Sequence, residues 1–485
     1  MKQLQAWTDL REGRAWMTNV ALCLLGVGLT LLARQFVQEY DHFWLGFNGT
    51  SELSAILYVA AVAIVLTQPV NRATLWIVLG FAVAMRAMTV FADPFTSSDI
   101  YRYVWDGIVQ HAHINPYRYV PGNAALTFLR KPNQEIFDNI NRRDYARTIY
   151  PPAAQMVYWA VTFFSPTVEA MKVAMFGFEC VTAGALLALL KLMGRSRVEI
   201  LLYAWCPLLV WEIGDGGHVD AVVMAFVALA LLFRFRNKPW LVGLFLGAAF
   251  LTKFYPLVLF PALWQRRDWK MPAVIGAMTA VGYAIYSSVG MLVFGFAGGY
   301  AKEEGIETGT RYFLLELVQH VRGLGGVPVA AFLVFCGVVF VALMVWAWKK
   351  ATAEVCVPVS GSAVAPSRDA HISESRYGAP EVAAPEFLKV GMAFAFALML
   401  LFSPHYPWYI VWLIPFFTLV PNLPVLVYLM MFFYMFTTPL ADGTIPNMFI
   451  VNKILYGAVL VAWFASLALK RWPVGRWFVS ADRRA

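Results

Sequence analysis

The chain has 485 residues, of which 60% are hydrophobic and only 14% are charged. This composition is far more apolar than that of soluble globular domains and excludes that class. The formal net charge of +9 could indicate an anionic partner, but the basic residues gather in short loops between apolar runs, a pattern typical of membrane topology. The sequence therefore predicts a polytopic membrane protein.

Apolar runs recur along the chain, and each approaches the roughly 20 residues that cross a bilayer as a helix. Lipid offers the backbone no hydrogen-bond partner, and the runs lack the alternation of barrel strands. We therefore expect an all-α polytopic membrane protein with about 12 transmembrane helices. The first run lacks an obvious cleavage site and is expected to be an uncleaved span. The expected spans are residues 16–34, 52–68, 73–91, 169–193, 198–213, 219–235, 271–296, 327–348, 388–403, 407–420, 423–440 and 449–469.

The distribution of Lys and Arg predicts the orientation of these spans. Loops rich in Lys and Arg face the cytoplasm under the positive-inside rule, which places both termini inside and the distinctive polar motifs outside. The expected outer segments are residues 35–51, 92–168, 214–218, 297–326, 404–406 and 441–448.

Three parts are expected along the chain. Residues 1–350 form an N-terminal membrane body that carries the large outer loop 92–168, and residues 388–485 form a C-terminal group of spans. Residues 351–387 are rich in Ala, Val, Pro, Ser and Glu without periodicity, which is typical of a flexible linker, here cytoplasmic. The cysteines show neither CxxC nor metal spacing, so disulfides and structural zinc are not expected.

Two segments do not fit simple spans. In the outer loop, residues 98–112 have a helical pattern that ends at Asn115-Pro116, and the short apolar run 153–166 is expected to be an interfacial or re-entrant helix. Residues 241–264 have basic flanks on both sides, and both flanks favour the cytoplasm. A re-entrant hairpin with Lys253 near its tip satisfies both.

The helix predicted in the outer loop carries the strongest chemical signal. Asp99, Arg102, Tyr103 and Asp106 are spaced i, i+3, i+4 and i+7, so they share one face. One interpretation is a solvated amphipathic helix with a weak ion pair. The functional interpretation is that a carboxylate takes a proton from an acceptor hydroxyl, which is general-base catalysis.

Two further motifs allow a structural and a functional interpretation. The segment 214–220, Gly-Asp-Gly-Gly-His-Val-Asp, is either an ordinary turn with an N-cap aspartate or part of a site through His218 and Asp220. Glu212 lies just inside the preceding span, where ionisable groups tend to be paired or functional. Lys253 either snorkels to the interface or meets an anion such as a lipid phosphate.

The remaining candidates add cations and aromatic rings to the outer side. Arg311 lies in one outer segment, and His405 and Tyr406 lie in another beside Trp408. These rings could equally form the interfacial aromatic belt. The sequence has no Walker loop, no HExxH and no soluble nucleotide-sugar domain, which argues against ATP-driven transport and cytosolic sugar-nucleotide chemistry.

Taken together, these motifs resemble those of the family C (GT-C) integral membrane glycosyltransferases, particularly the bacterial polyprenyl-phosphate-mannose-dependent mannosyltransferases. In the family, the large outer loop follows the first span of the shared core. Here two apolar segments, 16–34 and 52–68, precede the span before that loop. These two segments are either an N-terminal addition or a sign that the numbering of the core spans is displaced. The resembling pieces are Ser98-Asp99-Ile100-Tyr101-Arg102-Tyr103-Val104-Trp105-Asp106-Gly107, Asn115-Pro116-Tyr117, Gly217-His218-Val219-Asp220, Thr252-Lys253-Phe254-Tyr255-Pro256 and Ser403-Pro404-His405-Tyr406-Pro407-Trp408-Tyr409.

The resemblance implies transfer of a hexose, by family analogy mannose, from a polyprenyl-phosphate donor to an envelope glycan or lipid acceptor on the outer face of the inner (cytoplasmic) membrane. Asp99 matches the catalytic aspartate of the family. No cofactor and no nucleic-acid partner are expected, and no metal site is predicted, although paired acids leave metal dependence open. The expected substrate-binding residues are Arg102, Tyr103, Asp106, Asn115, Tyr117, His218, Asp220, Lys253, Tyr255, Arg311, His405 and Tyr406.

Two rival functions share the predicted architecture. A secondary transporter or flippase of a lipid-linked sugar would also have many spans and broken helices, but it predicts internal repeats, which the halves of the chain do not show. A scaffold subunit of a polysaccharide assembly would explain the spans but not the outward cluster of acids, cations and aromatics.

Overall fold

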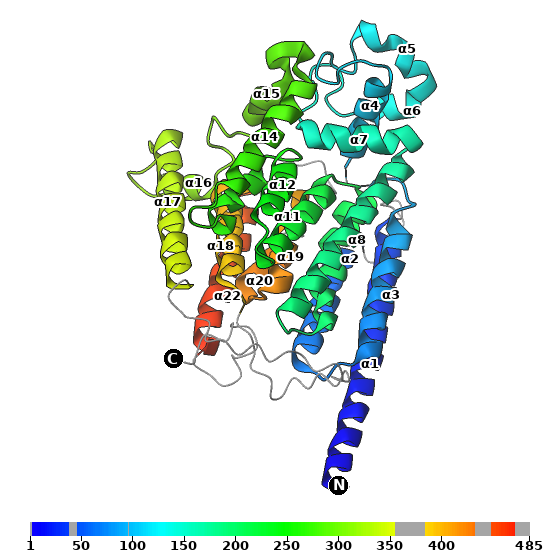
Figure 1. Ribbon diagram of the computed structural model, residues 1–485, viewed down its shortest axis with the longest axis vertical. Helices are drawn as coiled ribbons and strands as arrows, with labels where there is room; N and C mark the ends of the chain where they lie inside the picture. Colours follow the sequence, from blue (N-terminus) through cyan, green and yellow to red (C-terminus); the bar gives the residue numbers. More distant parts are fainter. Residues whose placement is uncertain (1, 38–45, 96, 355–383, 432–447, 471–485) are drawn as a thin grey trace.

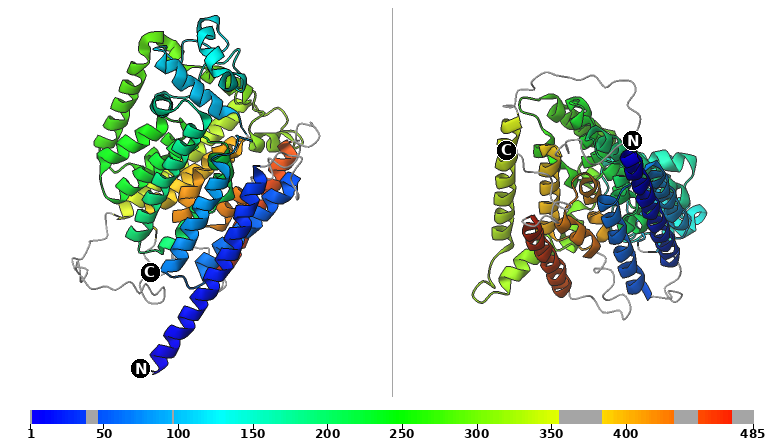
Figure 2. Two further views of the ribbon diagram at one scale, coloured as in Figure 1. Left: turned by 90° about the vertical axis from the view of Figure 1, so that its right-hand side faces the viewer. Right: turned by 90° about the horizontal axis from the view of Figure 1, so that it is seen from below.

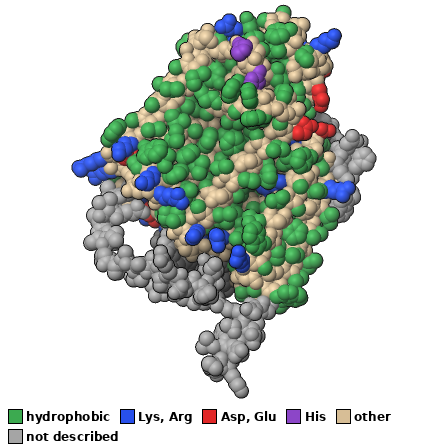
Figure 3. Space-filling view, turned by 45° about the vertical axis from the view of Figure 1, so that its right-hand side comes forward, with side chains coloured by type: hydrophobic (Ala, Val, Ile, Leu, Met, Phe, Trp, Pro, Cys, Tyr) green, Lys and Arg blue, Asp and Glu red, His purple; other side chains and the backbone are tan. Residues whose placement is uncertain are grey.

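The computed structural model describes residues 2–37, 46–95, 97–354, 384–431 and 448–470. Within these ranges the chain forms helices and no strand, which confirms the all-α prediction. Figure 1 shows the long helices running roughly side by side, with a group of shorter helices at one end. Hydrophobic side chains cover most of the face in Figure 3, and charged side chains lie mainly at its margins, as expected for a surface in contact with lipid.

Among the described residues, six helices are long and apolar enough to cross a membrane. A seventh crossing results if α14 (Lys270–Ile285) and the following Ser287–Glu303 form one span, bent by 113°. Figure 2 shows α1 and α17 on opposite sides of the bundle. The helices fit a multi-pass membrane protein, but the expected count of about 12 is not confirmed. The six are α1 (Lys2–Phe36), α2 (Gly46–Thr67), α3 (Arg72–Thr89), α8 (Val168–Leu192), α17 (Val329–Glu354) and α22 (Met448–Lys470).

Several expected spans are short or divided. The run 198–213 becomes η4 (Arg197–Ile200), α9 (Leu201–Ala204), α10 (Pro207–Leu209) and the π-helical η5 (Val210–Asp215). The run 407–420 becomes η8 (Pro407–Tyr409) and α19 (Leu413–Leu419). Pro207 explains the break between α9 and α10, because proline removes a backbone donor and clashes with the preceding turn. The other short helices are α11 (Asp220–Phe235), α18 (Glu386–Phe402) and α20 (Leu423–Met431), and the rest of the expected span 423–440 lies outside the described residues.

Two arginines satisfy carbonyls at the ends of short helices in these divided segments. Arg86 donates to the carbonyl oxygen of Ala204 over 2.5 Å and pairs with Glu179 over 2.8 Å. Arg195 likewise donates to the carbonyl oxygen of Leu419 and pairs with Glu199. Because an unsatisfied backbone group in an apolar interior costs several kcal/mol (about 2–7), these ion pairs allow a broken helix to persist inside the bundle.

The expected hairpin at 241–264 consists of α12 (Pro239–Phe250), η6 (Tyr255–Leu259) and α13 (Phe260–Leu263). The helix stops before Lys253, as the sequence predicts, and α12 packs against η6 and α14. Its re-entry into the membrane stays a prediction. The expected linker 351–387 lies mostly outside the described residues, since α17 ends at Glu354 and α18 begins at Glu386.

The outer loop supplies the short helices at one end of the bundle in Figure 1. There α7 runs across the direction of the long helices and packs on α4, an arrangement typical of an interfacial helix. Gly107 permits this contact, because a Cβ atom there would lie 2.8 Å from the carbonyl oxygen of Tyr158. The elements are α4 (Asp99–His111), η2 (Ala124–Leu126), α5 (Thr127–Arg130), η3 (Lys131–Asn133), α6 (Gln134–Asp138) and α7 (Pro152–Phe164), and the later outer segment forms η7 (Ser287–Phe294), α15 (Ala297–Glu303) and α16 (Phe313–Gln319).

Candidate active site

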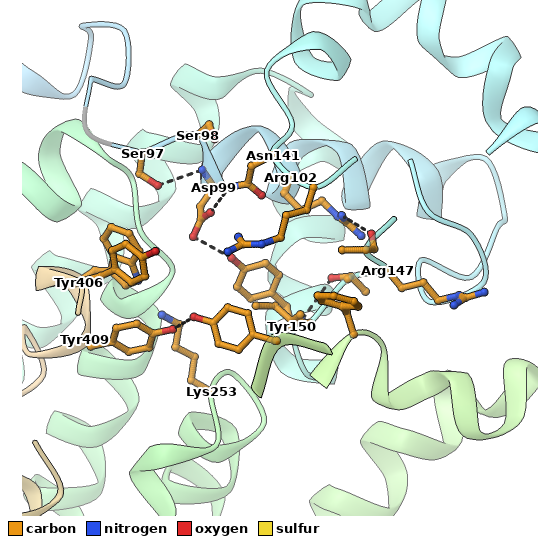
Figure 4. Close-up of a pocket in the computed structure, with 17 residues that line it drawn as sticks. Ser97, Ser98, Asp99, Arg102, Asn141, Arg147, Tyr150, Lys253, Tyr406 and Tyr409 are labelled. Atoms are coloured by element: carbon orange, nitrogen blue, oxygen red, sulfur yellow. Dashed lines mark hydrogen bonds between the residues drawn. The ribbon is translucent and has the colours of Figure 1, made fainter. Parts of the chain in front are cut away.

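A cavity of about 260 Å³ lies between the outer loop and the membrane body (Figure 4). The outer loop supplies most of one wall, and residues from three later segments supply the other. Four of the residues predicted from the sequence line it. These four are Asp99, Arg102, Lys253 and Tyr406. The remaining lining residues are Ser97, Ser98, Asn141, Arg142, Ala146, Arg147, Thr148, Ile149, Tyr150, Phe296, Tyr300, Trp408 and Tyr409.

Asp99 is half-buried at the first turn of α4, where the helix dipole stabilises a negative charge. Its Oδ1 accepts a hydrogen bond from Asn141 Nδ2 over 2.8 Å, and its Oδ2 accepts one from the Tyr150 hydroxyl over 3.3 Å. Figure 4 shows the three side chains converging on the cavity. A carboxylate has about four lone-pair positions, so Asp99 is oriented and can still accept a proton.

Tyr150 is suited to donating to Asp99. Burial and the nearby Asp99 carboxylate raise the pKa of Tyr150 well above its usual value, so its hydroxyl keeps its proton. Tyr103 packs edge-on against the Tyr150 ring at 5.0 Å and stacks on Tyr158 at 4.7 Å. Tyr103 therefore lies behind the cavity wall and supports the residue that contacts the proposed base.

Hydrogen bonds from two other segments hold the chain that precedes α4. Lys172 donates to the carbonyl oxygens of Thr89 and Ala92 over 2.9 and 2.6 Å. Asp215 accepts from the backbone N–H of Phe95 over 3.0 Å. These contacts place the start of α4, and with it Asp99, at the outer end of the bundle.

The glycines of segment 214–220 allow this region to pack closely on α4. Gly217 has a φ of +62°, and a Cβ atom there would lie 2.3 Å from Ile100 Cδ1. A side chain at this position is therefore disfavoured both by backbone conformation and by contact. The motif has at least this structural role.

Cations outnumber acids around the cavity. Among the described lining residues Asp99 is the one acid, and it lies with Arg102, Arg142, Arg147 and Lys253. Arg102 is bonded to Asp106 over 2.8 Å and to the carbonyl oxygen of Ala146. Three of these four cations are paired with acids behind the lining, and their remaining N–H donors suit an anionic group in this partly enclosed site.

Lys253 is held at the cavity by acidic and aromatic neighbours. Its Nζ lies 2.5 Å from Asp220 Oδ2, and the Tyr255 hydroxyl donates to Asp220 Oδ1 over 2.8 Å. The ammonium also lies 5.2 Å from the centre of the Tyr409 ring. The side chain is 15% exposed, whereas Asp220 is fully buried. Because an ammonium has three donors, Lys253 can also bind an anion in the cavity.

Other predicted residues do not line the cavity. Asp106 is occupied by Arg102 and by Gln155 Nε2, and Asn115 donates to the carbonyl oxygen of Tyr286. The Tyr117 hydroxyl donates to the carbonyl oxygen of Tyr150. These contacts hold the outer loop together, so direct substrate contact stays a prediction for this group. The residues outside the lining are Tyr103, Asp106, Asn115, Tyr117, His218, Asp220, Tyr255, Arg311 and His405.

Arg311 and His405 lie behind the residues that line the cavity. Arg311 pairs with Glu304 and donates to the carbonyl oxygen of Phe402, and its guanidinium carbon lies 5.6 Å from the centre of the Tyr409 ring. Burial lowers the pKa of His405, and Arg311 lowers it further, so the imidazole is neutral near pH 7. Neither residue lines the cavity, and of the two only Arg311 carries a charge that acts on it.

The sequence did not single out several lining residues. Asn141, Arg142 and Arg147 come from the irregular stretch between α6 and α7, which has no periodicity to mark one face. Tyr300 comes from α15 and contacts the Tyr409 hydroxyl, although the two are far apart in sequence. The one sequence signal for these residues was the high density of polar side chains in their segments, within an otherwise apolar chain. Among the described residues there is no group of three or more His, Cys, Asp or Glu side chains arranged to hold a metal ion.

Part of the chain matches a family of known enzymes. The family model of glycosyltransferase family 87 matches residues 148–364, somewhat less than half of the chain. It supports a membrane glycosyltransferase. Such an enzyme implies a sugar donor, an acceptor and a membrane environment. The matched region contains Tyr150, Lys253 and Tyr300 but not Asp99. No curated protein and no solved structure matches the chain.

Proposed function

We propose that this glycosyltransferase moves a hexose, specifically mannose, from a polyprenyl phosphate to an envelope glycan or lipid on the outer face of the inner membrane. The observation that carries the proposal is the half-buried Asp99 carboxylate, held by Asn141 and Tyr150 in a cavity rich in cations. The outer loop that lines the cavity lies at one end of the helical bundle (Figure 1), where a lipid-linked donor would present its sugar.

The proposed reaction is a single displacement. Asp99 takes the proton of an acceptor hydroxyl, and the oxygen forms a bond to the anomeric carbon. The bond from that carbon to the phosphate oxygen breaks, and its electron pair leaves with the polyprenyl phosphate. Attack from the side opposite the leaving group inverts the anomeric centre.

The cations of the cavity would stabilise the leaving group. Negative charge grows on the phosphate as the bond breaks, so cations placed in advance lower the barrier. Lys253 and Arg102 are the predicted partners, and the structure adds Arg142, which is paired with Glu303 over 2.7 Å. Arg311 would act on the leaving group from behind the lining, whereas the neutral His405 would contribute only as a hydrogen-bond donor.

The donor is tested in membranes that contain the chain and in matched membranes without it. Labelled polyprenyl-phosphate-mannose should label an endogenous acceptor only where the chain is present. Labelled GDP-mannose, added while synthesis of the lipid-linked sugar is blocked, should give no label. Chain-dependent label from GDP-mannose under that block would contradict the proposed donor. Label from polyprenyl-phosphate-glucose but not from the mannose donor would change the sugar and keep the chemistry.

A further inference from the structure

Two ionisable side chains lie buried behind the cavity wall, and neither takes part in the displacement proposed above. Glu212, in η5, and His218 are both 0% exposed. Neither the Glu212 carboxyl oxygens nor the His218 ring nitrogens have a hydrogen-bond partner in the described part of the chain. Buried polar groups are normally bonded, because each unbonded one costs about 1–3 kcal/mol. This pair therefore calls for a specific explanation.

The two groups are placed to satisfy one another. Glu212 Oε2 lies 3.4 Å from His218 Nε2, slightly beyond a good hydrogen bond. A small rotation would allow a protonated carboxyl group to donate to the imidazole nitrogen. A charged carboxylate is disfavoured here chiefly by burial. Asp215 and Asp220 also act on Glu212 with the same sign, and Lys253, which acts with the opposite sign, is bound to Asp220.

His218 links this pair to the cavity wall. The His218 ring stacks on Trp408 with centres 4.3 Å apart, and Trp408 stacks on Tyr406 with centres 4.5 Å apart. Trp408 and Tyr406 both line the cavity, whereas His218 does not. The imidazole is therefore the innermost layer of a three-ring stack whose outer two rings face the substrate space.

We propose that Glu212 and His218 form an uncharged pair sharing one proton, and that this pair fixes Trp408 and Tyr406 as the wall that holds the donor sugar. Glu212 and His218 are positioning residues, because they touch the wall and not the substrate. The inference rests on the proposed function, since it assigns that wall to the sugar of the donor. It explains why an acid and an imidazole persist in an apolar interior.

Replacement of Glu212 separates a hydrogen-bonding role from a charged one. Glu212→Gln keeps the shape and an N–H donor, so the KM for polyprenyl-phosphate-mannose should stay within about twofold of the intact chain. Glu212→Met removes the donor and should raise that KM roughly tenfold while kcat changes much less, because the wall is misplaced and Asp99 is not. Loss of activity in Glu212→Gln would overturn the proposal by showing that the negative charge is needed. An unchanged KM in Glu212→Met would also overturn it.

A double-variant cycle excludes a general effect on folding. Trp408→Leu should raise the donor KM, and adding Glu212→Met to it should raise the KM no further, because Glu212 acts through Trp408. The proposal would be contradicted if the donor KM of the double variant rose by the product of the two single-variant increases. Activity of the intact chain with the lipid donor is measured first, so that failure of the proposed function is recognised before the variants are compared.

Discussion

Charged residues in the membrane body and around the outer cavity are of the same types, but their partners differ. Arg86 and Glu179 are each only 3% exposed, and Arg86 also binds a carbonyl released by a broken helix. Arg142 and Glu303 are 30% and 32% exposed at the rim of the cavity. The first pair holds the bundle together, whereas the second faces a space that a substrate can enter.

This difference refines a common inference about membrane proteins. An ionisable residue inside an apolar helix is often taken as a sign of a substrate site. Here Arg86, inside α3, serves the backbone of a broken segment instead. Two observations separate structural charges from functional ones. A structural charge has all its partners inside the protein, whereas a functional charge lies beside a cavity.

The largest expected effect on stability is in the membrane body. Arg86→Leu leaves Glu179 buried without its cation, which should cost about 3–5 kcal/mol of stability. The fraction of folded, monodisperse protein after heating in detergent, measured by size-exclusion chromatography, should fall sharply. Glu179→Leu should behave in the same way. Normal heat resistance of both variants would show that the pair does not hold the bundle.

The next effect concerns the donor. Lys253→Ala removes a cation that lines the cavity and is bound to Asp220. The kcat/KM for the lipid donor should fall about 10- to 100-fold, which corresponds to the loss of one charge-assisted hydrogen bond. The KM for the acceptor should change much less. Lys253→Arg, which keeps the charge, serves as the matched control. An unchanged donor KM in Lys253→Ala would count against a phosphate contact.

A smaller effect is expected for variants of the residues that orient Asp99 by hydrogen bonds. Asn141→Ala removes the hydrogen bond to Asp99 Oδ1, and kcat should fall about tenfold, with the donor KM within about twofold. Tyr150→Phe should lower kcat similarly, since it removes the other donor. Single-turnover transfer rates measure this directly. A rise in donor KM without a fall in kcat would indicate that these residues bind the donor instead of orienting the base.

The smallest effect on stability is at the cavity rim. Arg142→Gln breaks an ion pair that is about one-third exposed, and such pairs contribute only about 0–1 kcal/mol. Heat resistance should be almost unchanged, in contrast to Arg86→Leu. A loss of stability equal to that of Arg86→Leu would remove the distinction between the two regions.

Local patterns predicted part of this structure well. Hydropathy and the absence of alternation gave the all-α class, and helical spacing placed Asp99 and Arg102 on one face of α4. The number of spans was not predictable in the same way, because the break at Pro207 persists through a tertiary contact, the bond from Arg86 to the carbonyl oxygen of Ala204. Asn141 could not be found from periodicity, since only the folded loop brings it to Asp99.

The central claim is that Asp99 is the general base, and transfer by Asp99→Asn tests it most directly. The change keeps the shape of the side chain and removes its capacity to take a proton. With equal amounts of folded protein in the membrane, transfer from polyprenyl-phosphate-mannose should fall by a factor of about 10²–10⁴. Asp93→Asn, which alters an exposed acid of the same loop outside the cavity lining, should leave transfer unchanged. Full transfer by Asp99→Asn would contradict the account.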